Sequence, residues 1–147
     1  MIRKGRFALW KSKEYELISY QRQYYLQSKN QSDLQSGFKE IPGNASVFVK
    51  KISVKELEDA YEIIPFVMIS GHRFAVEGYN INTGIVALVT NNPFVQKKID
   101  VKPYGKYEYI IEISHEDICI IEDRISILGF ENTYYWKTSL LSGKFFC

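Results

Sequence analysis

Histidine and cysteine are the residues of this sequence best suited to chemistry, but their spacing favours none of the common mechanisms. The chain has two histidines, His72 and His115, and two cysteines, Cys119 and Cys147. His115 and Cys119 are four residues apart, which would place them on one face of a helix as a nucleophile pair. Isoleucines flank Cys119, however, and an apolar environment disfavours the reactive thiolate. We therefore expect Cys119 to be a free, buried thiol, both histidines to be structural or surface residues, and the protein not to be an enzyme.

Metal and cofactor sites are not indicated by the motifs of the chain. The sequence has no Cys-x-x-Cys pair, no His-Glu-x-x-His motif and no Asp-rich calcium loop, and its glycines are not spaced as a phosphate-binding loop. The acidic runs 56–62 and 116–123 fit the solvated faces of short helices better than paired catalytic carboxylates. We therefore predict no cofactor and no metal site.

Aromatic and acidic residues point instead to binding. Aromatic residues make up 15% of the chain and include eleven tyrosines, more than a core of this size obviously needs. Tyrosine and tryptophan anchor protein interfaces, and the acidic stretch 108–124 would complement a basic partner. These two features select the candidate partner-binding residues: Tyr24, Tyr25, Glu112, Glu116, Asp117, Glu122, Asp123, Tyr134 and Trp136.

Single-stranded nucleic acid is the alternative partner. Basic residues interleave with Trp10 between Arg3 and Lys13, as they would in a groove that binds a single strand. The net charge is only +2, and the acidic stretch 108–124 would repel phosphate. A protein partner is therefore preferred to nucleic acid.

The elements that must position these residues are mostly strands. Alternating β-branched and aromatic residues predict them, and Asn, Gly and Pro mark the turns between them. The predicted strands are 6–10, 15–19, 23–28, 46–52, 73–77, 84–90, 99–102, 107–113, 125–128 and 134–137. Ser53 and Ser114 each precede an acidic residue by three positions, and this capping-box spacing predicts two short helices. Their apolar faces would consist of Leu57, Ala60 and Tyr61 in the first helix and of Ile118 and Ile121 in the second, with Ile125 as a further candidate. The polar stretch 27–36 is predicted to be a loop.

An internal repeat relates the two halves of the chain. The motif Ile-Ser-x-x-Glu-Leu at 52–57 resembles Ile-Ser-x-x-Asp-Ile at 113–118, and the same register places Phe48 opposite Tyr109 and Pro42 opposite Pro103. In addition, Gly-Arg-Phe-Ala at 5–8 resembles Gly-His-Arg-Phe-Ala at 71–75. These matches suggest related units at about 5–63 and 71–125, although chance similarity between alternating sequences is the competing explanation.

The predicted fold is a β-rich α+β protein. It consists of two related antiparallel β-sheet units, small-barrel-like, each with a short capped helix and packed together. The first unit covers residues 1–70, and the second covers residues 71–147 with a C-terminal extension. One compact domain made of both is the alternative, because a unit of this size does not easily support a full core alone.

A strand-rich chain with Ser-x-x-Glu and Ser-x-x-Asp caps, two cysteines and no catalytic motif resembles the immunity proteins that bacteria make against polymorphic or contact-dependent toxins. The resemblance implies a cytoplasmic inhibitor that binds one toxin domain and blocks its active site by charge and shape complementarity. A tandem small-barrel interaction module is the other candidate. A membrane location is not expected, because the longest apolar run, 63–69, is far below the ~20 residues that a spanning helix needs.

Overall fold

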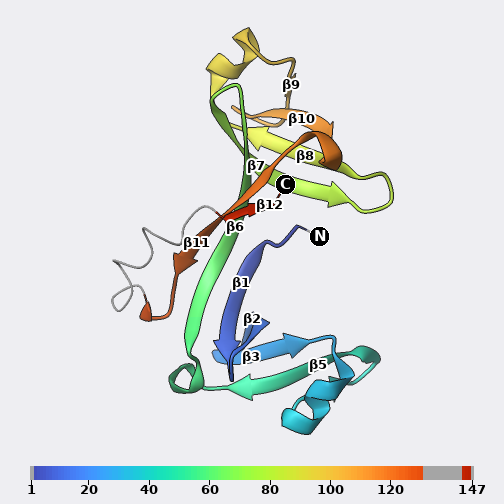
Figure 1. Cartoon of the computed structure of the whole chain (residues 1–147), viewed down its shortest axis with the longest axis vertical. Coiled ribbons are helices and arrows are strands. Elements are labelled where there is room, and N and C mark those ends of the chain that lie inside the picture. Colours follow the sequence, from blue (N-terminus) through green and yellow to red (C-terminus); the bar gives the residue numbers. More distant parts are fainter. Residues whose placement is uncertain (1, 131–143, 147) are drawn as a thin grey trace. The chain divides into compact units, whose positions relative to one another are not determined.

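The computed structural model describes residues 2–130 and 144–146, and strands dominate it (Figure 1). The strands form one open antiparallel sheet, so the β-rich class is confirmed, whereas the strand pairings do not close a barrel. The helical segments of the described residues are 3₁₀ turns of three to six residues, shorter than predicted. None of these segments is long and apolar enough to cross a membrane.

The elements follow one another along the chain with short connections. The strands are β1 (Gly5–Trp10), β2 (Lys13–Tyr20), β3 (Gln23–Ser28), β4 (Lys39–Ile41), β5 (Asn44–Ile52), β6 (Asp59–Ile69), β7 (His72–Asn80), β8 (Ile85–Thr90), β9 (Lys102–Pro103), β10 (Tyr109–Ser114), β11 (Ile120–Ser126) and β12 (Lys144–Phe146). The 3₁₀ turns are η1 (Gln31–Ser36), η2 (Val54–Glu56), η3 (Pro93–Lys97) and η4 (His115–Asp117). The sequence did not predict β4 or β6, and the predicted strand 134–137 lies outside the described residues.

The chain divides into two compact units. The first unit contains residues 5–63 and 124–130, and the second unit contains residues 2–4, 64–123 and 144–146. The boundary falls inside β6, between residues 63 and 64, so this strand contributes residues to both units.

Both units have the same strand order. The order is β4-β5-β3-β2-β1-β6 in the first unit and β9-β10-β8-β7-β6-β11 in the second. Each unit therefore consists of a three-stranded meander, a 3₁₀ turn, a short edge strand, and a strand beside the third strand of the meander. A second 3₁₀ turn then leads to a strand that pairs with the first strand of the meander. One topology is thus repeated element for element.

The strand registers test the predicted repeat residue by residue. Phe48 pairs with Ser28 of β3, and Tyr109 pairs with Thr90 of β8, which confirms that Phe48 and Tyr109 are equivalent. The caps at Ser53 and Ser114 are equivalent by the same criterion, because each begins the 3₁₀ turn after that strand.

The predicted match between 5–8 and 71–75 is wrong. Phe7 lies in β1, whereas Phe74 lies in β7, the counterpart of β2. The true counterpart of Phe74 is Tyr15, because Tyr15 pairs with Ala8 of the first strand of its unit and Phe74 pairs with Val67 in the same way. Both rings are buried, so the shared Arg-Phe-Ala letters reflect the general strand pattern and not an equivalent position.

Both serines cap a 3₁₀ turn, and each helix ends after one turn. The capping box is complete at Ser53, whereas at Ser114 the structure gives the hydroxyl accepting from Glu116 N–H (3.4 Å). The backbone N–H of Ser53 donates to Glu56 (2.9 Å) and the Ser53 hydroxyl accepts from Lys55 N–H (3.4 Å). The chain becomes extended at Leu57 and enters β6 at Asp59. Residues 60–61, assigned to a helical face from the sequence, are instead buried strand residues paired with β1, because long-range pairing outweighs local helical periodicity.

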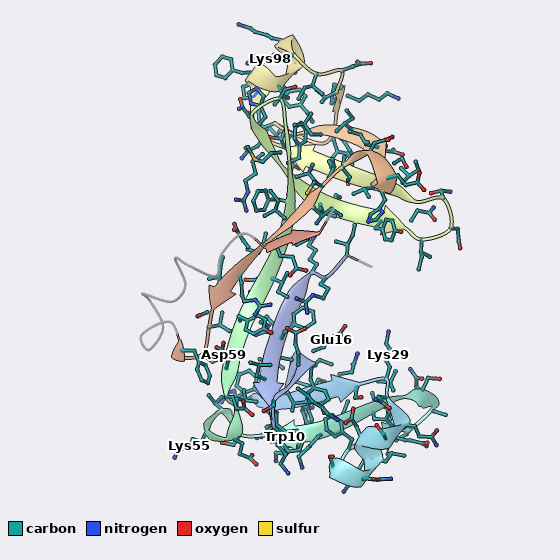
Figure 2. All side chains as sticks on the ribbon, in the orientation of Figure 1. Trp10, Glu16, Lys29, Lys55, Asp59 and Lys98 are labelled. Carbon is teal, nitrogen blue, oxygen red and sulfur yellow. The ribbon has the colours of Figure 1, made fainter. Side chains whose placement is uncertain are left out.

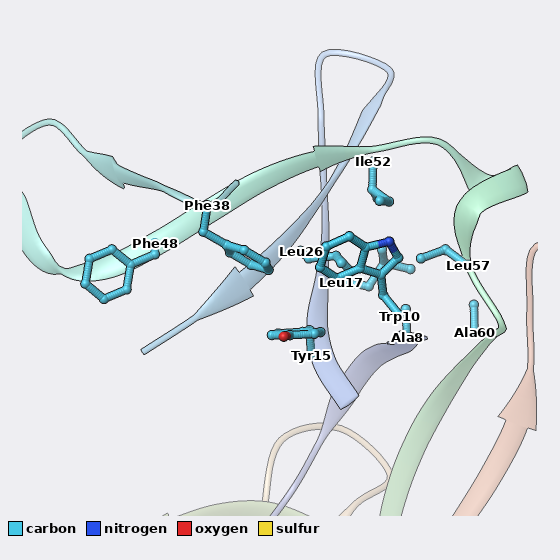
Figure 3. Packing of buried hydrophobic residues seen from close by; sticks show 10 residues of the cluster. All are labelled: Ala8, Trp10, Tyr15, Leu17, Leu26, Phe38, Phe48, Ile52, Leu57 and Ala60. Carbon is cyan, nitrogen blue, oxygen red and sulfur yellow. The ribbon is translucent and has the colours of Figure 1, made fainter. Parts of the chain in front are cut away.

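Each unit has its own hydrophobic core. In the first unit Trp10 packs against Tyr15 and Phe38, with ring centroids 6.3 and 6.0 Å apart, and Leu26 is fully buried beside them (Figure 3). In the second unit the most buried core residues are Phe74, Val86, Leu88 and Val95. Apolar burial of this kind is the main force that holds the strands of each unit together.

Candidate binding groove

The potential catalytic residues do not assemble into a site. His72 lies within hydrogen-bond distance of the Asn92 side chain (3.2 Å), and the His115 ring packs against Tyr79 with centroids 5.6 Å apart. Cys119 is half-buried and disulfide-bonded, so the expectation of a free thiol is wrong. Among the described residues no group of three or more His, Cys, Asp or Glu side chains could hold a metal ion.

A groove on the second unit has a volume of about 730 Å³. We call it the β7–β8 groove. Its lining comes from the β7–β8 hairpin and from β10: Gly78, Tyr79, Asn80, Ile81, Thr83, Ile85, Ala87 and Glu112.

Small side chains create the groove. Gly78, Ala87 and Glu112 lie opposite one another on β7, β8 and β10, and we call them the groove row. A Cβ atom built on Gly78 would meet no atom within 4 Å, so open space lies above this position. The strand register shifts between Val76 and Gly78, and this bulge ends regular pairing at the edge of the groove.

The first unit has large side chains in the equivalent row. Ile18, Tyr25 and Lys51 pair across β2, β3 and β5, and we call them the filled row. Isoleucine and tyrosine thus stand where the second unit has glycine and alanine. The third position changes from lysine to glutamate, which reverses the charge. A smaller groove of about 440 Å³, lined in part by Lys51, lies beside the filled row, so the second unit is distinguished by the wider opening at Gly78 and Ala87.

The end of the groove is held by a tight turn and by η4. The Asn80 side chain accepts from the backbone N–H of Asn82 (2.9 Å) and of Thr83 (3.3 Å), which fixes the turn. Gly84 follows with φ of 74°, a conformation that favours glycine, and its carbonyl accepts from His115 N–H (2.7 Å). The start of η4 is therefore attached to the hairpin that forms the groove.

The predicted acidic residues separate into two sets. Glu112 lines the groove, and Glu116 and Asp117 are exposed on the attached turn η4. Glu122 is only 3% exposed and accepts two hydrogen bonds from the Arg3 guanidinium (3.1 and 3.0 Å). Asp123 pairs with Arg73 at 2.7 Å. The first set is available to a partner, whereas the second set is engaged in ion pairs within the second unit.

The predicted aromatic anchors have different surroundings. Tyr24 packs against the core of the first unit and also lines a smaller groove of about 440 Å³ between β3 and β5. Tyr25 belongs to the filled row and is half-buried. Tyr134 and Trp136 lie outside the described residues. The sequence predictions missed Gly78 and Ala87, which become visible only when the repeat is aligned in its true register.

Three residues of the basic N-terminal stretch, Arg3, Lys4 and Trp10, are engaged within the fold. Arg3 is paired with Glu122, and the Lys4 ammonium donates to the backbone carbonyl of Val76 (3.1 Å). Trp10 is only 6% exposed, so its ring is not free to stack on a base. These side chains stabilise the fold of their units.

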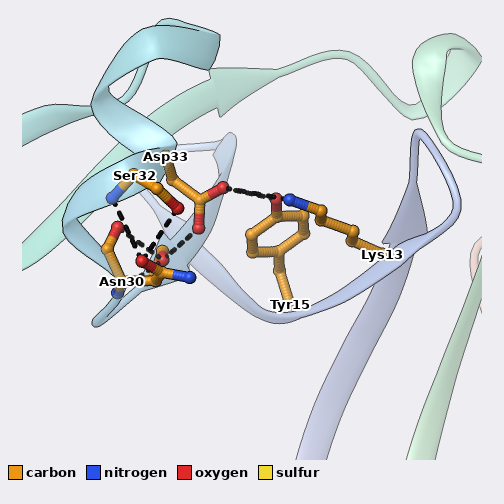
Figure 4. Close-up of polar contacts among 6 residues, drawn as sticks. Lys13, Tyr15, Asn30, Ser32 and Asp33 are labelled. Atoms are coloured by element: carbon orange, nitrogen blue, oxygen red, sulfur yellow. Dashed lines mark hydrogen bonds and ion pairs between the residues drawn. The ribbon is translucent and has the colours of Figure 1, made fainter.

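A buried polar cluster distinguishes the first unit (Figure 4). The Asp33 carboxylate accepts from the Tyr15 hydroxyl (2.9 Å) and from the Ser28 hydroxyl (2.5 Å), and Lys13 lies 4.0 Å away. Burial, followed by the hydrogen bond to Asp33 and its negative charge, raises the pKa of Tyr15 to about 12. This cluster fixes η1 to the sheet of the first unit.

The second unit has apolar residues at the corresponding places. Phe74 is the counterpart of Tyr15 by strand register. Val95 is the counterpart of Asp33, because the backbone N–H of each donates to the carbonyl of the Asn that caps its turn. Asn30 and Asn92 both cap through their side chains. The same turn is thus held by polar contacts in one unit and by apolar packing in the other.

These features define an antiparallel β-sheet protein with a repeated strand order and an open groove on one unit, without a catalytic cluster in the residues described. The chain belongs to the family described as uncharacterised conserved protein UCP033725, whose model matches residues 2–129. No curated protein and no solved structure matches the chain significantly.

Proposed function

We propose that this chain is a binding protein that recognises a partner protein through the β7–β8 groove. The observation that carries this proposal is the contrast between the groove row and the filled row. The same row of one repeated topology carries large side chains in the first unit and Gly78 and Ala87 in the second, and the groove beside it measures about 440 Å³ in the first unit against about 730 Å³ in the second. Because the fold does not need the wider opening, binding is the simplest reason for it.

The groove suits a partner segment that combines an apolar side chain with a positive charge. Tyr79, Ile81 and Ile85 provide apolar walls, and Ile81 is 69% exposed. Burying such side chains would supply affinity. Glu112 at the groove and the exposed acids of η4 would favour a basic segment and set its orientation.

We further propose that the two units are small-barrel-like modules related by duplication. The identical strand order and the equivalent caps at Ser53 and Ser114 support this relation. Duplication followed by divergence would leave one module filled at this position and the other open. A tandem arrangement of this kind fits an interaction protein better than an enzyme.

The narrower form of the proposal is an immunity protein that inhibits a bacterial toxin domain from the cytoplasm. The acidic groove supports this form, since a toxin that cleaves nucleic acid carries a basic active site. Co-expression with a candidate toxin domain should rescue growth and give a complex on size-exclusion chromatography. If nuclease toxins give neither growth rescue nor a complex, the immunity form of the proposal is refuted, whereas recognition of another partner through the groove is not.

Groove recognition itself is tested with a displayed peptide library selected on the intact protein. Ala87→Tyr fills the groove with the residue that the first unit has, and Tyr25→Ala is the matched control in the filled row. Selected peptides should carry Lys or Arg beside an apolar residue and should lose about tenfold or more in affinity for Ala87→Tyr. Equal binding to wild type and Ala87→Tyr would refute the proposal.

A further inference from the structure

A second surface of the second unit combines exposed rings with lysines. It consists of residues 93–107, which run from η3 through β9 into the turn before β10, and we call it the η3–β9 segment. Phe94 is 64% exposed, Tyr107 is 77% exposed, and Tyr104 is also exposed. The exposed lysines of the segment are Lys97, Lys98, Lys102 and Lys106, and Lys98 is labelled in Figure 2.

Strand pairing brings the two ends of this segment together. Tyr109, at the start of β10, pairs with both Thr90 at the end of β8 and Pro103 of β9. The chain enters η3 just after Thr90 and reaches the turn 104–107 just after Pro103. The rings and lysines of both parts therefore lie at one end of the sheet of the second unit.

The first unit shows that the fold does not require these residues. Counted from the capping residues Asn30 and Asn92, the positions of Phe94, Lys97 and Lys98 correspond to Ser32, Gln35 and Ser36. The aromatic residue of that part of the first unit, Phe38, is buried in the core at 3% exposure. Residues 31–46 contain one lysine against two acids, whereas residues 93–107 contain four lysines against Asp100 alone.

The backbone at Tyr107 adds an independent observation. Tyr107 has φ of 66°, the left-handed region that a bulky aromatic residue rarely adopts. The conformation is strained and the ring lies in solvent, so burial does not explain the presence of an aromatic side chain there.

We propose that the η3–β9 segment is a binding site for single-stranded nucleic acid, in which the exposed rings stack on bases and the lysines contact phosphates. Aromatic rings among lysines are typical of surfaces that bind single strands. Protein interfaces also use aromatic residues but are depleted in lysine, which argues against a protein at this surface. The exposed acids at this surface are Asp100, Glu108 and Glu112, and Asp100 and Glu112 line a small hollow together with Lys102.

The test uses the full chain and fluorescein-labelled single strands of about 12 nucleotides, one of deoxythymidine and one of uridine. Fluorescence anisotropy is measured from low to physiological salt. If the four lysines contact phosphates, the logarithm of the affinity should fall with the logarithm of the salt concentration with a slope of about −3.

Three variants alter the η3–β9 segment, and a fourth is a control. Phe94→Ser should weaken binding about 5- to 100-fold, as should Tyr107→Ser, through loss of stacking. Lys97→Gln combined with Lys98→Ser should reduce the slope by about 1.4. Lys39→Gln, in β4 of the first unit, should change neither value. Circular dichroism and thermal unfolding verify that each variant folds, which is expected because the altered side chains are exposed.

The outcomes decide the proposal. Binding with this salt slope, lost in the segment variants and kept in Lys39→Gln, supports it. No binding to either strand at low salt overturns it, as does binding that Tyr107→Ser and Phe94→Ser leave unchanged. Binding to vesicles with anionic lipid but not to either oligonucleotide also overturns it and assigns the surface to a membrane.

Discussion

The polar cluster around Asp33 predicts a double-mutant cycle within the first unit. Tyr15→Phe removes the hydroxyl that donates to Asp33, and Asp33→Val removes the acceptor. The double variant carries Phe and Val, the residue types that Phe74 and Val95 place at the corresponding positions of the second unit. The repeat thus supplies a natural template for replacing a buried polar pair by an apolar one.

The magnitudes follow from the contacts. Tyr15 is 7% exposed and Asp33 is 4% exposed, so a hydrogen bond to the carboxylate contributes about 1.5–3 kcal/mol. Tyr15→Phe should therefore lower the free energy of unfolding by about that amount. The Lys13 ammonium is exposed and contributes little. The double variant should be more stable than the sum of the single losses predicts, by about 1.5–3 kcal/mol, because the hydrogen bond between Tyr15 and Asp33 is counted in both single losses but is lost only once. The Ser28 hydroxyl loses its acceptor in Asp33→Val and in the double variant alike, so its contribution cancels from the cycle.

The pKa of Tyr15 adds a pH dependence with a defined sign. The folded protein retains the Tyr15 proton up to a pKa of about 12, whereas the unfolded chain releases it near the ordinary value of 10.0. The stabilisation is therefore complete below pH 10 and is lost as the pH rises toward 12. Each pH unit in that window removes about 1.4 kcal/mol. Tyr15→Phe has no hydroxyl that titrates, so the difference in free energy of unfolding between wild type and Tyr15→Phe should narrow above pH 10.

Urea unfolding followed by fluorescence of the buried Trp10 measures these quantities at pH 8, 10 and 11. Tyr20→Phe is the control, because Tyr20 is 61% exposed and its replacement should change stability by less than about 0.5 kcal/mol. A difference in stability between wild type and Tyr15→Phe that stays constant from pH 8 to 11 would refute the raised pKa of Tyr15. Additive single losses in the double variant would refute the pairing itself.

Three further predictions concern stability. Arg3→Met should lower the free energy of unfolding by about 3–5 kcal/mol, measured by thermal unfolding, because it leaves the Glu122 carboxylate buried without the guanidinium that donates to it. The double variant Arg3→Met, Glu122→Leu should recover most of this loss. A loss below about 1 kcal/mol in Arg3→Met would contradict the argument. Ser53→Ala and Ser114→Ala should each cost about 0.5–2 kcal/mol by the same assay, and unaffected stability in either would show that its cap is dispensable. Phe74→Ala should cost about 3–5 kcal/mol by urea unfolding, and a loss under 1 kcal/mol would contradict its place in the core.

Local sequence signals predicted the strands well because side-chain alternation and turn residues are local properties. The predicted strand 23–28 coincides with β3, and 46–52 lies within β5. The strand β6 was missed because the Ser53 cap and the residues after it also fit a helix. Its pairing with β1, which decides between the two, joins residues about 50 positions apart and leaves no local signal.

The candidate site was predicted only in part, for a similar reason. Glu112 was selected as an acidic residue and does line the groove, but Glu122 was selected by the same criterion and is buried against Arg3. Composition cannot separate the two, because their environments depend on partners far away in the sequence. A glycine such as Gly78 does not by itself predict a groove. It becomes informative only when the larger residue at the equivalent position of the first unit is known.

The repeated topology makes such differences between the two units informative. Each position of the second unit has a counterpart that experiences nearly the same strand neighbours, so a difference between them is not demanded by the fold. Lys51 against Glu112 reverses a charge, and Ser32 against Phe94 exposes a ring. The net charge of +2 averages over such local differences and does not reveal them. If the second unit has diverged for binding, exchanging its distinguishing residues for those of the first should abolish recognition while leaving its stability nearly unchanged.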